Sequence, residues 1–201
     1  MSEETERDLA RSEAGPPGDA ELRALAEVTA GECRSYLDAV TLVAAGEGDE
    51  AAVPLLVLAV SQLLAAGARL GATRDVLPRA RFEPDVGPEP DVEPLRMGLA
   101  RVLLTVDGYT ETADPLTMKD VVPGSLSDDL ASVASDIAHG LRHFESGDAG
   151  EAMWWWQFSY LSNWGSRGAG ALRALLSLLS HARLDIDADI AAEAAFEALH
   201  A

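Results

Sequence analysis

Acidic and imidazole side chains gather on one stretch of predicted helix. The candidate metal ligands in this stretch are Asp128, Asp129, Asp136, His139 and His143. Asp136, His139 and His143 follow one another at intervals of three and four residues, so a helix places all three on one face. Carboxylate and imidazole ligands suit Mn, Fe or Zn. We therefore treat these residues as a candidate metal site, to which Glu111 and Asp114 of the preceding connection could add oxygen ligands.

The same pattern has plainer interpretations. Acids and histidines are common on a solvated helix face, and acids are frequent throughout this chain. A histidine pair spaced by four residues also gives a surface whose charge changes near neutral pH without any metal. We therefore predict no cofactor, and keep a divalent metal ion as the alternative.

Aromatic side chains are concentrated in the segment EAMWWWQFSYLSNWG, residues 151–165, which contains all four tryptophans of the chain. On a helical wheel most of them share one broad arc with other apolar residues, which indicates burial in a core. The members of this arc are Met153, Trp154, Trp156, Phe158, Tyr160, Leu161 and Trp164. The opposite, polar side carries Glu151, Ser159 and Ser162.

Two residues of this segment do not follow the arc. Trp155 falls on the polar side, so we expect it either under a neighbouring segment or exposed as an anchor for a partner. Gln157 falls in the apolar arc, where a buried amide needs partners because unmet groups cost about 1–3 kcal/mol. Together with Tyr160, Trp164 and Phe82, they are the candidates for binding a partner or a small ligand.

Phe82 belongs to a second unusual segment, TRDVLPRARFEPDVGPEPDVEP, residues 73–94, which contains five of the ten prolines. Proline fixes φ and disfavours helix in the residue before it, so this segment should be extended. It also carries several apolar side chains, and a structureless loop of this length is unusual. We therefore predict a strap that lies across the bundle rather than a free linker.

Composition limits the classes of partner. The chain has 34 acidic residues against 15 Lys and Arg, a formal net charge of −19. Such a surface repels nucleic acid and favours a protein partner with a basic patch, for example a nucleic-acid-handling protein. The uncharged run from Ala51 to Ala68 is interpreted as a core helix rather than a membrane span. A single cysteine, Cys33, and the lack of a signal pattern at the N-terminus lead us to expect a cytoplasmic protein.

Helical periodicity predicts an all-α, single-domain antiparallel bundle over residues 19–184, with a disordered acidic tail at 1–18 and a C-terminal helix within 185–201. Helices are expected at about 20–45, from Pro54 to about Gly71, at 93–110, after Ser125, from about 149, and at 187–199. Ser125 is a candidate N-cap because Asp128 stands three residues later. No convincing strand pattern is found.

Established catalytic motifs are missing from the sequence, which contains no GxxxxGK[ST], HExxH, CxxC or GxSxG pattern. We therefore assign no catalytic residue, and expect a non-enzymatic interaction or regulatory protein. One alternative is a hydrolase of nucleotides or phosphate esters that holds its metal through Glu111, Asp128, Asp129 and Asp136. Another is a small-ligand sensor with an aromatic pocket around Trp156, Tyr160 and Trp164.

A series of segments resembles one bacterial family, the domain of unknown function 5063. These segments are VPLLVLAVSQLLAAGARLGA, RFEPDVGPEPDV, Y…DP, SLSDDLASVASDI…GL and AMWWWQFSYLSNWG…ALRAL, which together span about residues 36–184. The resemblance implies a compact, soluble helical domain and carries no activity, cofactor or site residue. Relatives commonly have HWG followed by a further His, whereas Asn163 stands at the first of these positions here. An activity that depended on those imidazoles would lack them in this chain.

Overall fold

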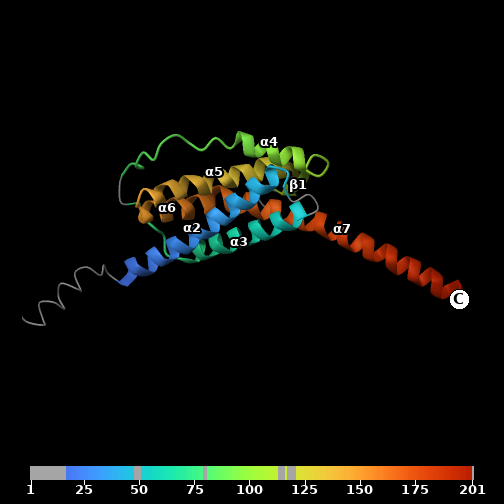
Figure 1. The fold of residues 1–201 in the computed structure, drawn as a ribbon. Helices are drawn as coiled ribbons and strands as arrows, with labels where there is room; N and C mark the ends of the chain where they lie inside the picture. Colours follow the sequence, from blue (N-terminus) through green and yellow to red (C-terminus); the bar gives the residue numbers. More distant parts are fainter. Residues whose placement is uncertain (1–16, 48–50, 79–80, 113–115, 117–120, 201) are drawn as a thin grey trace, which may run out of the picture.

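The computed structural model describes residues 17–47, 51–78, 81–112, 116 and 121–200, with side chains described between 20 and 184. Long helices form most of the molecule, as the sequence predicts, and a short two-stranded sheet joins two of them (Figure 1). The elements are α2 (Pro17–Ala44), α3 (Ala52–Ala72), α4 (Glu93–Val102), β1 (Gly108–Thr112), β2 (Val121–Ser125), α5 (Leu126–Glu145), α6 (Ala149–Ser159), η2 (Tyr160–Trp164) and α7 (Gly165–His200).

The core lies between α2, α3, α5 and the continuous rod formed by α6, η2 and α7 (Figure 1). Its largest fully buried side chains include Trp156, Trp164 and Tyr36, and the Tyr36 hydroxyl donates to the Leu130 carbonyl at 2.9 Å. Among the described residues, α3 alone has the length and apolar composition of a membrane span. In this bundle Leu56, Val60, Leu63 and Leu70 of α3 are buried in the protein core.

Helix α5, which carries the candidate histidines, begins as the sequence predicts. The Ser125 hydroxyl accepts the backbone N–H of Asp128 at 3.2 Å, so the predicted N-cap is confirmed. The helix ends before Gly147, which has a φ of 91° in the left-handed region that favours glycine. The chain then turns back at once into α6, because the Asp148 N–H donates to the His143 carbonyl at 3.0 Å.

The expectation of no strands is wrong. Strands β1 and β2 pair antiparallel, with Gly108 opposite Ser125 and Thr112 opposite Val121. The helix predicted over 93–110 ends at Val102 instead. An isolated two-stranded hairpin is marginal in water, and here side chains tie it to α5. The Asp107 carboxylate accepts the backbone N–H of Ser127 at 2.7 Å, an arrangement that local periodicity does not reveal.

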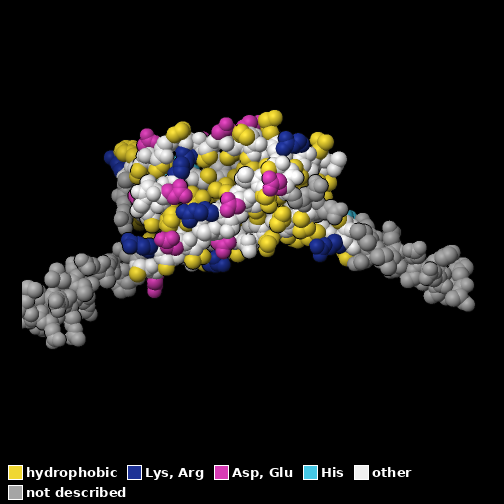
Figure 2. Space-filling view, viewed as in Figure 1, with side chains coloured by type: hydrophobic (Ala, Val, Ile, Leu, Met, Phe, Trp, Pro, Cys, Tyr) yellow, Lys and Arg dark blue, Asp and Glu magenta, His cyan; other side chains and the backbone are white. Residues whose placement is uncertain are grey.

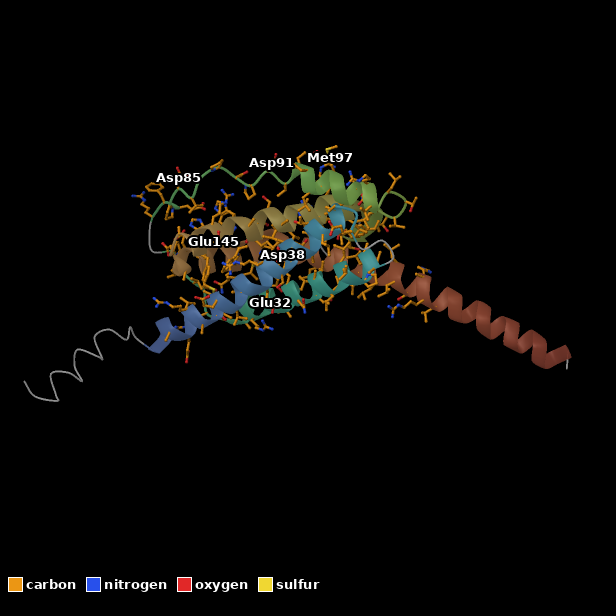
Figure 3. All side chains as sticks on the ribbon, viewed as in Figure 1. Glu32, Asp38, Asp85, Asp91, Met97 and Glu145 are labelled. Atoms are coloured by element: carbon orange, nitrogen blue, oxygen red, sulfur yellow. The ribbon has the colours of Figure 1, made fainter. Side chains whose placement is uncertain are left out.

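The segment between α3 and α4, residues 73–92, has no helix or strand in its described part and passes over α5, as the labels Asp85 and Asp91 show (Figure 3). Its start is attached to α6, because the Val76 N–H donates to Gln157 Oε1 at 2.7 Å. Further along, the Arg142 guanidinium of α5 donates to the Pro88 carbonyl. Phe82 is exposed. The interpretation of this segment as a strap that lies across the bundle stays a prediction.

The predicted orientation of the aromatic helix is wrong in part. Glu151 and Ser159, expected on the polar side, are buried, whereas Phe158 and Leu161 are 52% and 67% exposed. Helix α6 contacts α2, α3 and α5, so neighbours cover most of its circumference and no single apolar arc marks the buried face. The π-helical turn η2 then changes the phase of the side chains before α7. The helix expected separately at 187–199 is the end of α7.

Candidate metal centre

Two histidines of α5 lie one helical turn apart on the face that is turned toward the segment 73–92. The side chain of His143 is 0% exposed and that of His139 is 14% exposed. Their ring centroids are 5.1 Å apart, and the planes meet at 66°. The indole of Trp155 packs against His139 with centroids 4.2 Å apart, and its Nε1 donates to the Asp136 carbonyl at 2.8 Å. Trp155 therefore restrains one of the two imidazoles.

A carboxylate from a distant part of the sequence meets both imidazoles. Glu83 Oε1 contacts His139 Nε2 and lies 2.9 Å from His143 Nε2. The three ligand atoms all lie within 4.8 Å of one another. Burial acts to raise the pKa of Glu83, but the hydrogen bonds with His139 and His143 outweigh it and hold that pKa below its usual value. The site therefore favours a charged carboxylate against the two imidazoles.

The backbone around Glu83 explains how this carboxylate reaches α5. Pro84 follows it directly, and the residue before a proline is restricted to extended conformations. The Arg142 contact with the Pro88 carbonyl holds the same segment against α5 a few residues later. Glu83 is thus presented from an extended backbone, while helical geometry alone places the two histidines on one face.

A second carboxylate, Glu151, is buried near this cluster, at the start of α6. The residue is 1% exposed, and within the described part of the structure neither carboxylate oxygen has a hydrogen-bond partner. The same holds for Nδ1 of His143. Burial raises the pKa of Glu151, the charge of His143 opposes this effect, and the charges of Asp148 and Glu83 add to it. The cluster therefore has a buried acidic neighbour.

Two imidazole nitrogens and one carboxylate oxygen at this spacing could bind a divalent transition metal ion. Imidazole suits Zn, Fe, Cu and Ni, and a carboxylate oxygen extends this range toward Mn. Three protein ligands leave at least one coordination position for water or another ligand, whereas closed structural sites usually have four protein ligands. His139 and His143 are thus the two sequence-predicted metal ligands that the structure brings together.

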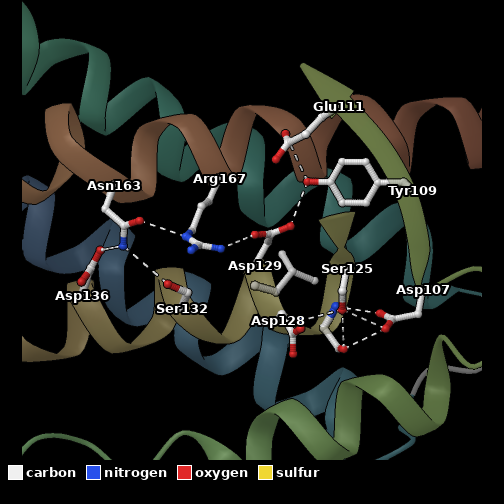
Figure 4. Close-up of polar contacts among 12 residues, drawn as sticks. Asp107, Tyr109, Glu111, Ser125, Asp128, Asp129, Ser132, Asp136, Asn163 and Arg167 are labelled. Atoms are coloured by element: carbon white, nitrogen blue, oxygen red, sulfur yellow. Dashed lines mark hydrogen bonds and ion pairs between the residues drawn. The ribbon is translucent and has the colours of Figure 1, made fainter. Parts of the chain in front are cut away.

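The three predicted aspartates lie elsewhere on α5 (Figure 4). The Asp128 carboxylate is exposed, 3.4 Å from Arg96. Asp129 accepts the Arg167 guanidinium at 2.7 Å and the Tyr109 hydroxyl at 2.8 Å. The Asp136 carboxylate accepts the Asn163 amide at 2.8 Å. These carboxylates are paired with side chains of other elements and do not converge on the histidine cluster.

The polar chain in Figure 4 instead joins α5 to the hairpin and to α7. Arg167 Nε donates to Asn163 Oδ1 at 2.9 Å, so Asp129 and Asp136 are linked through these two residues. Glu111 contacts the Tyr109 hydroxyl at 3.5 Å. Burial, and then Asp129, raise the pKa of Tyr109, so this hydroxyl stays protonated and acts as a donor. Asp114, the other oxygen ligand considered, lies outside the described residues.

The candidate partner-binding residues have mostly structural contacts. The Gln157 amide donates to the Leu70 carbonyl at 2.9 Å, so it closes the C-terminal end of α3. Tyr160 and Trp164 pack against each other with centroids 4.7 Å apart and fill the space above Gly67. Phe82 is exposed, with the Arg81 guanidinium 5.5 Å from its ring centroid. Phe82 is thus the most accessible of these candidates.

Two cavities of the described structure lie away from the tryptophans. One, of about 460 Å³, lies between α2, α5 and the segment 73–92 and is lined in part by Leu37, Pro88 and Arg142. The other, of about 390 Å³, lies between β1 and α7. Neither is lined by Trp156, Tyr160 or Trp164, which pack into the core. These cavities give no support to an aromatic ligand pocket.

Glu83 and Glu151 are the members of this site that the sequence did not identify. Glu83 is one acid among several in a proline-rich segment, and its distance from α5 depends on the path of that segment. Glu151 falls on the polar side of the helical wheel, where an exposed acid is expected. The one signal available for Glu83 is the position directly before a proline, which is common in this segment.

The fold and this cluster together define a helical-bundle protein with a carboxylate–histidine site between one helix and an extended segment. The chain belongs to the family described as domain of unknown function, DUF5063, and the match covers residues 20–181. The resemblance predicted from the sequence is therefore confirmed.

A crystal structure of protein BF1032 from Bacteroides fragilis has a similar fold, with a TM-score of 0.57 and 20% sequence identity. The similarity covers 77% of this chain and 89% of that chain, and at this identity it shows the fold alone. No curated protein is significantly similar to this chain.

Proposed function

We propose that this protein binds a divalent transition metal ion at Glu83, His139 and His143 and acts as a metal-responsive regulatory protein. The observation that supports the proposal is the convergence of three ligand atoms within 4.8 Å of one another. Two of them are imidazole nitrogens on consecutive turns of a rigid helix, which is a favourable arrangement for two ligands of one ion.

The surroundings of the histidines favour a metal over an ordinary surface ion pair. A solvated pair is worth about 0–1 kcal/mol and gives no reason to bury two imidazoles beside one carboxylate oxygen. Here His143 is fully buried, and Trp155 packs on His139. Metal sites commonly have such outer groups, because they hold ligating rings in one orientation.

A regulatory role follows from where the ligands come from. The histidines belong to α5, whereas Glu83 belongs to the segment 73–92, so a bound ion would tie these two parts of the chain together. The ion would thereby change the stability of one surface segment without requiring a substrate. The acidic side chains spread over the face in Figure 2 would suit a protein partner with a basic surface, in the cytoplasm.

The hydrolase alternative has less support from the geometry. Its proposed ligands Asp129 and Asp136 are held by Arg167 and Asn163, and a metal would have to displace these partners. Asp128 is exposed beside Arg96. We therefore place the metal at the histidines and assign no catalytic step to the protein.

Calorimetric titration of zinc into chelator-treated protein, with any affinity tag removed, tests the proposal. We expect one ion per chain, and binding weakened at least about tenfold in both Glu83→Gln and His139→Ala. Asp128→Asn is the matched control, because it removes an acid of the same helix that lies outside the cluster. Absence of binding by the wild type, or equal weakening in Asp128→Asn and His139→Ala, would contradict the proposal.

A further inference from the structure

The carboxylate of Glu151 is buried without a hydrogen-bond partner among the described residues. It is 1% exposed, and its two oxygens accept no hydrogen bond there, although its backbone N–H donates to the Asp148 carboxylate at 3.0 Å. Buried polar groups are nearly always satisfied, and an unpaired buried carboxylate is costly. We therefore expect a hydrogen-bond donor to pair with this carboxylate in the functional form of the protein.

The ring of His143 also has a buried nitrogen without a hydrogen-bond partner among the described residues. Its Nε2 faces Glu83, whereas its Nδ1 is buried without a hydrogen-bond partner in the described structure. An imidazole that binds a metal through Nε2 must carry its proton on Nδ1, and that proton needs an acceptor. The ring therefore has one nitrogen directed to the site and one nitrogen without an acceptor.

A tight turn between α5 and α6 joins the segments that carry the two groups. The Asp148 N–H donates to the His143 carbonyl at 3.0 Å, and Asp148 then caps α6 by accepting from Glu151. The first turn of α6 therefore lies close to the last turns of α5. The electrostatic effect of His143 on the pKa of Glu151 is consistent with this proximity.

We propose that Glu151 is the positioning residue of the metal site: in the metal-bound form its carboxylate accepts the Nδ1 proton of His143, a hydrogen bond that the described structure does not contain, and so keeps Nε2 unprotonated and directed at the metal. This inference rests on the proposed function. Carboxylates that orient a ligating histidine recur in metal sites, and their loss typically costs 10–100-fold in metal affinity. The arrangement would give a partner to His143 Nδ1 and to one carboxylate oxygen of Glu151, both of which lack one in the described structure.

The proposal predicts opposite effects of Glu151→Gln on the two forms of the protein. Without metal, the substitution replaces a buried, unpaired carboxyl group by a neutral amide, so the melting temperature should rise at a pH where the carboxyl group is ionised. With metal, it removes the anionic acceptor of His143, so zinc affinity should fall by about 10–100-fold. A residue with a merely structural role would lower the melting temperature and leave the affinity unchanged.

The experiment measures zinc affinity by competition with a chromophoric chelator, melting of the metal-free protein, and the tautomer of His143 by nitrogen-15 NMR of the zinc form. Glu145→Gln is the matched control, because it removes an exposed carboxylate of α5 that pairs with Arg34. We expect lower affinity, higher metal-free stability and a loss of the Nδ1-protonated form only in Glu151→Gln. Glu151→Asp should restore part of the affinity.

The outcomes separate this inference from the proposed function. If the wild type binds zinc and Glu151→Gln binds it equally well, Glu151 does not position His143, while the metal site stands. If affinity falls but the tautomer of His143 is unchanged, Glu151 is a direct ligand and the inference is wrong. If the wild type binds no zinc, both fail.

Discussion

Asp136 shows at the scale of single residues how a neighbour decides what an acid on α5 can do. Its carboxylate is partly buried between α5 and η2, where it accepts a hydrogen bond from Asn163, with Arg167 and His139 as the nearby charged groups. Burial raises its pKa, and the Asn163 hydrogen bond, Arg167 and His139 only partly oppose this effect. Asp136 is therefore a structural acid, although its spacing from His139 predicts a ligand.

Asp136→Asn should reduce the pH dependence of stability. The folded-state pKa is raised, so protonation of Asp136 favours the folded state; this stability is full below the unfolded pKa of about 4 and is lost as pH rises through the folded pKa. Urea unfolding of both metal-free proteins at several pH values between 4 and 7 measures the difference. Relative to the variant, the wild type should lose free energy of unfolding as pH rises. A difference that is constant with pH would contradict the assignment.

The sequence predicts the residues of the site only where geometry is local. His139 and His143 share a helix, so their spacing alone places them together. Glu83 stands more than fifty positions earlier in an irregular segment, and no periodicity relates it to α5. The helical wheel places Glu151 on the polar side, because one wheel cannot show that α6 is covered on several sides. The positions of Glu83 and Glu151 therefore depend on the path of the chain and on the packing of neighbouring helices, which local sequence patterns do not predict.

At the scale of elements, α5 and α6 pack closely against each other. The approach depends on Gly140, above which the Trp156 indole lies, with its Nε1 donating to the Ile137 carbonyl at 3.1 Å. A Cβ at residue 140 would overlap the indole ring of Trp156. Glycine is thus required at this position by packing and not by backbone conformation.

Gly140→Ala should destabilise the protein by about 1–3 kcal/mol, because a well-packed core does not accept an added methyl group without displacement. Gly31→Ala on α2 is the control: a Cβ there meets nothing within 4 Å, and alanine in place of an exposed helical glycine should stabilise by about 0.5–1 kcal/mol. Chemical unfolding measures both. Equal effects of the two substitutions would show that the interpretation of α5–α6 packing is wrong.

Metal binding should protect the segment 73–92 from proteolysis. Arg81 is exposed and lies two residues before Glu83, so trypsin can cleave after it when the segment leaves α5. At zinc one hundred times above Kd, a ligand that binds only the attached form adds about 2.7 kcal/mol, which corresponds to cleavage slowed by about 100-fold.

Mass spectrometry of the peptides follows this cleavage. Cleavage after Arg183, in the exposed part of α7, provides an internal reference that zinc should not alter. Glu83→Gln should remove the protection. If zinc slows cleavage after Arg81 equally in this variant, the segment is not attached through Glu83.

Among the elements, the sequence predicts the long helices and the start of α5 at Ser125 because these depend on local periodicity and capping. It misses the hairpin, since Gly108–Thr112 and Val121–Ser125 are short and are stabilised by contacts with α5, such as that of Tyr109 with Asp129. It also misses the π-helical turn, because no residue pattern predicts one. Short elements that depend on neighbours are the ones that propensity does not predict.

At the scale of the whole molecule, the proposed site joins the helical bundle to the extended segment 73–92. The bundle supplies two imidazoles on a buried helix face, and the irregular segment supplies the carboxylate that meets them. The acidic surface, with a formal net charge of −19, would attract a divalent cation at long range without specifying its site. The specificity proposed here therefore resides in the cluster and not in the net charge.

The most direct test is a crystal of the protein grown with one equivalent of zinc and measured at the zinc absorption edge. We expect a single anomalous peak per chain within about 2.0–2.2 Å of a Glu83 carboxylate oxygen, His139 Nε2 and His143 Nε2. A peak at the aspartates of α5, or no peak at all, would contradict the central claim that these three residues form a metal site.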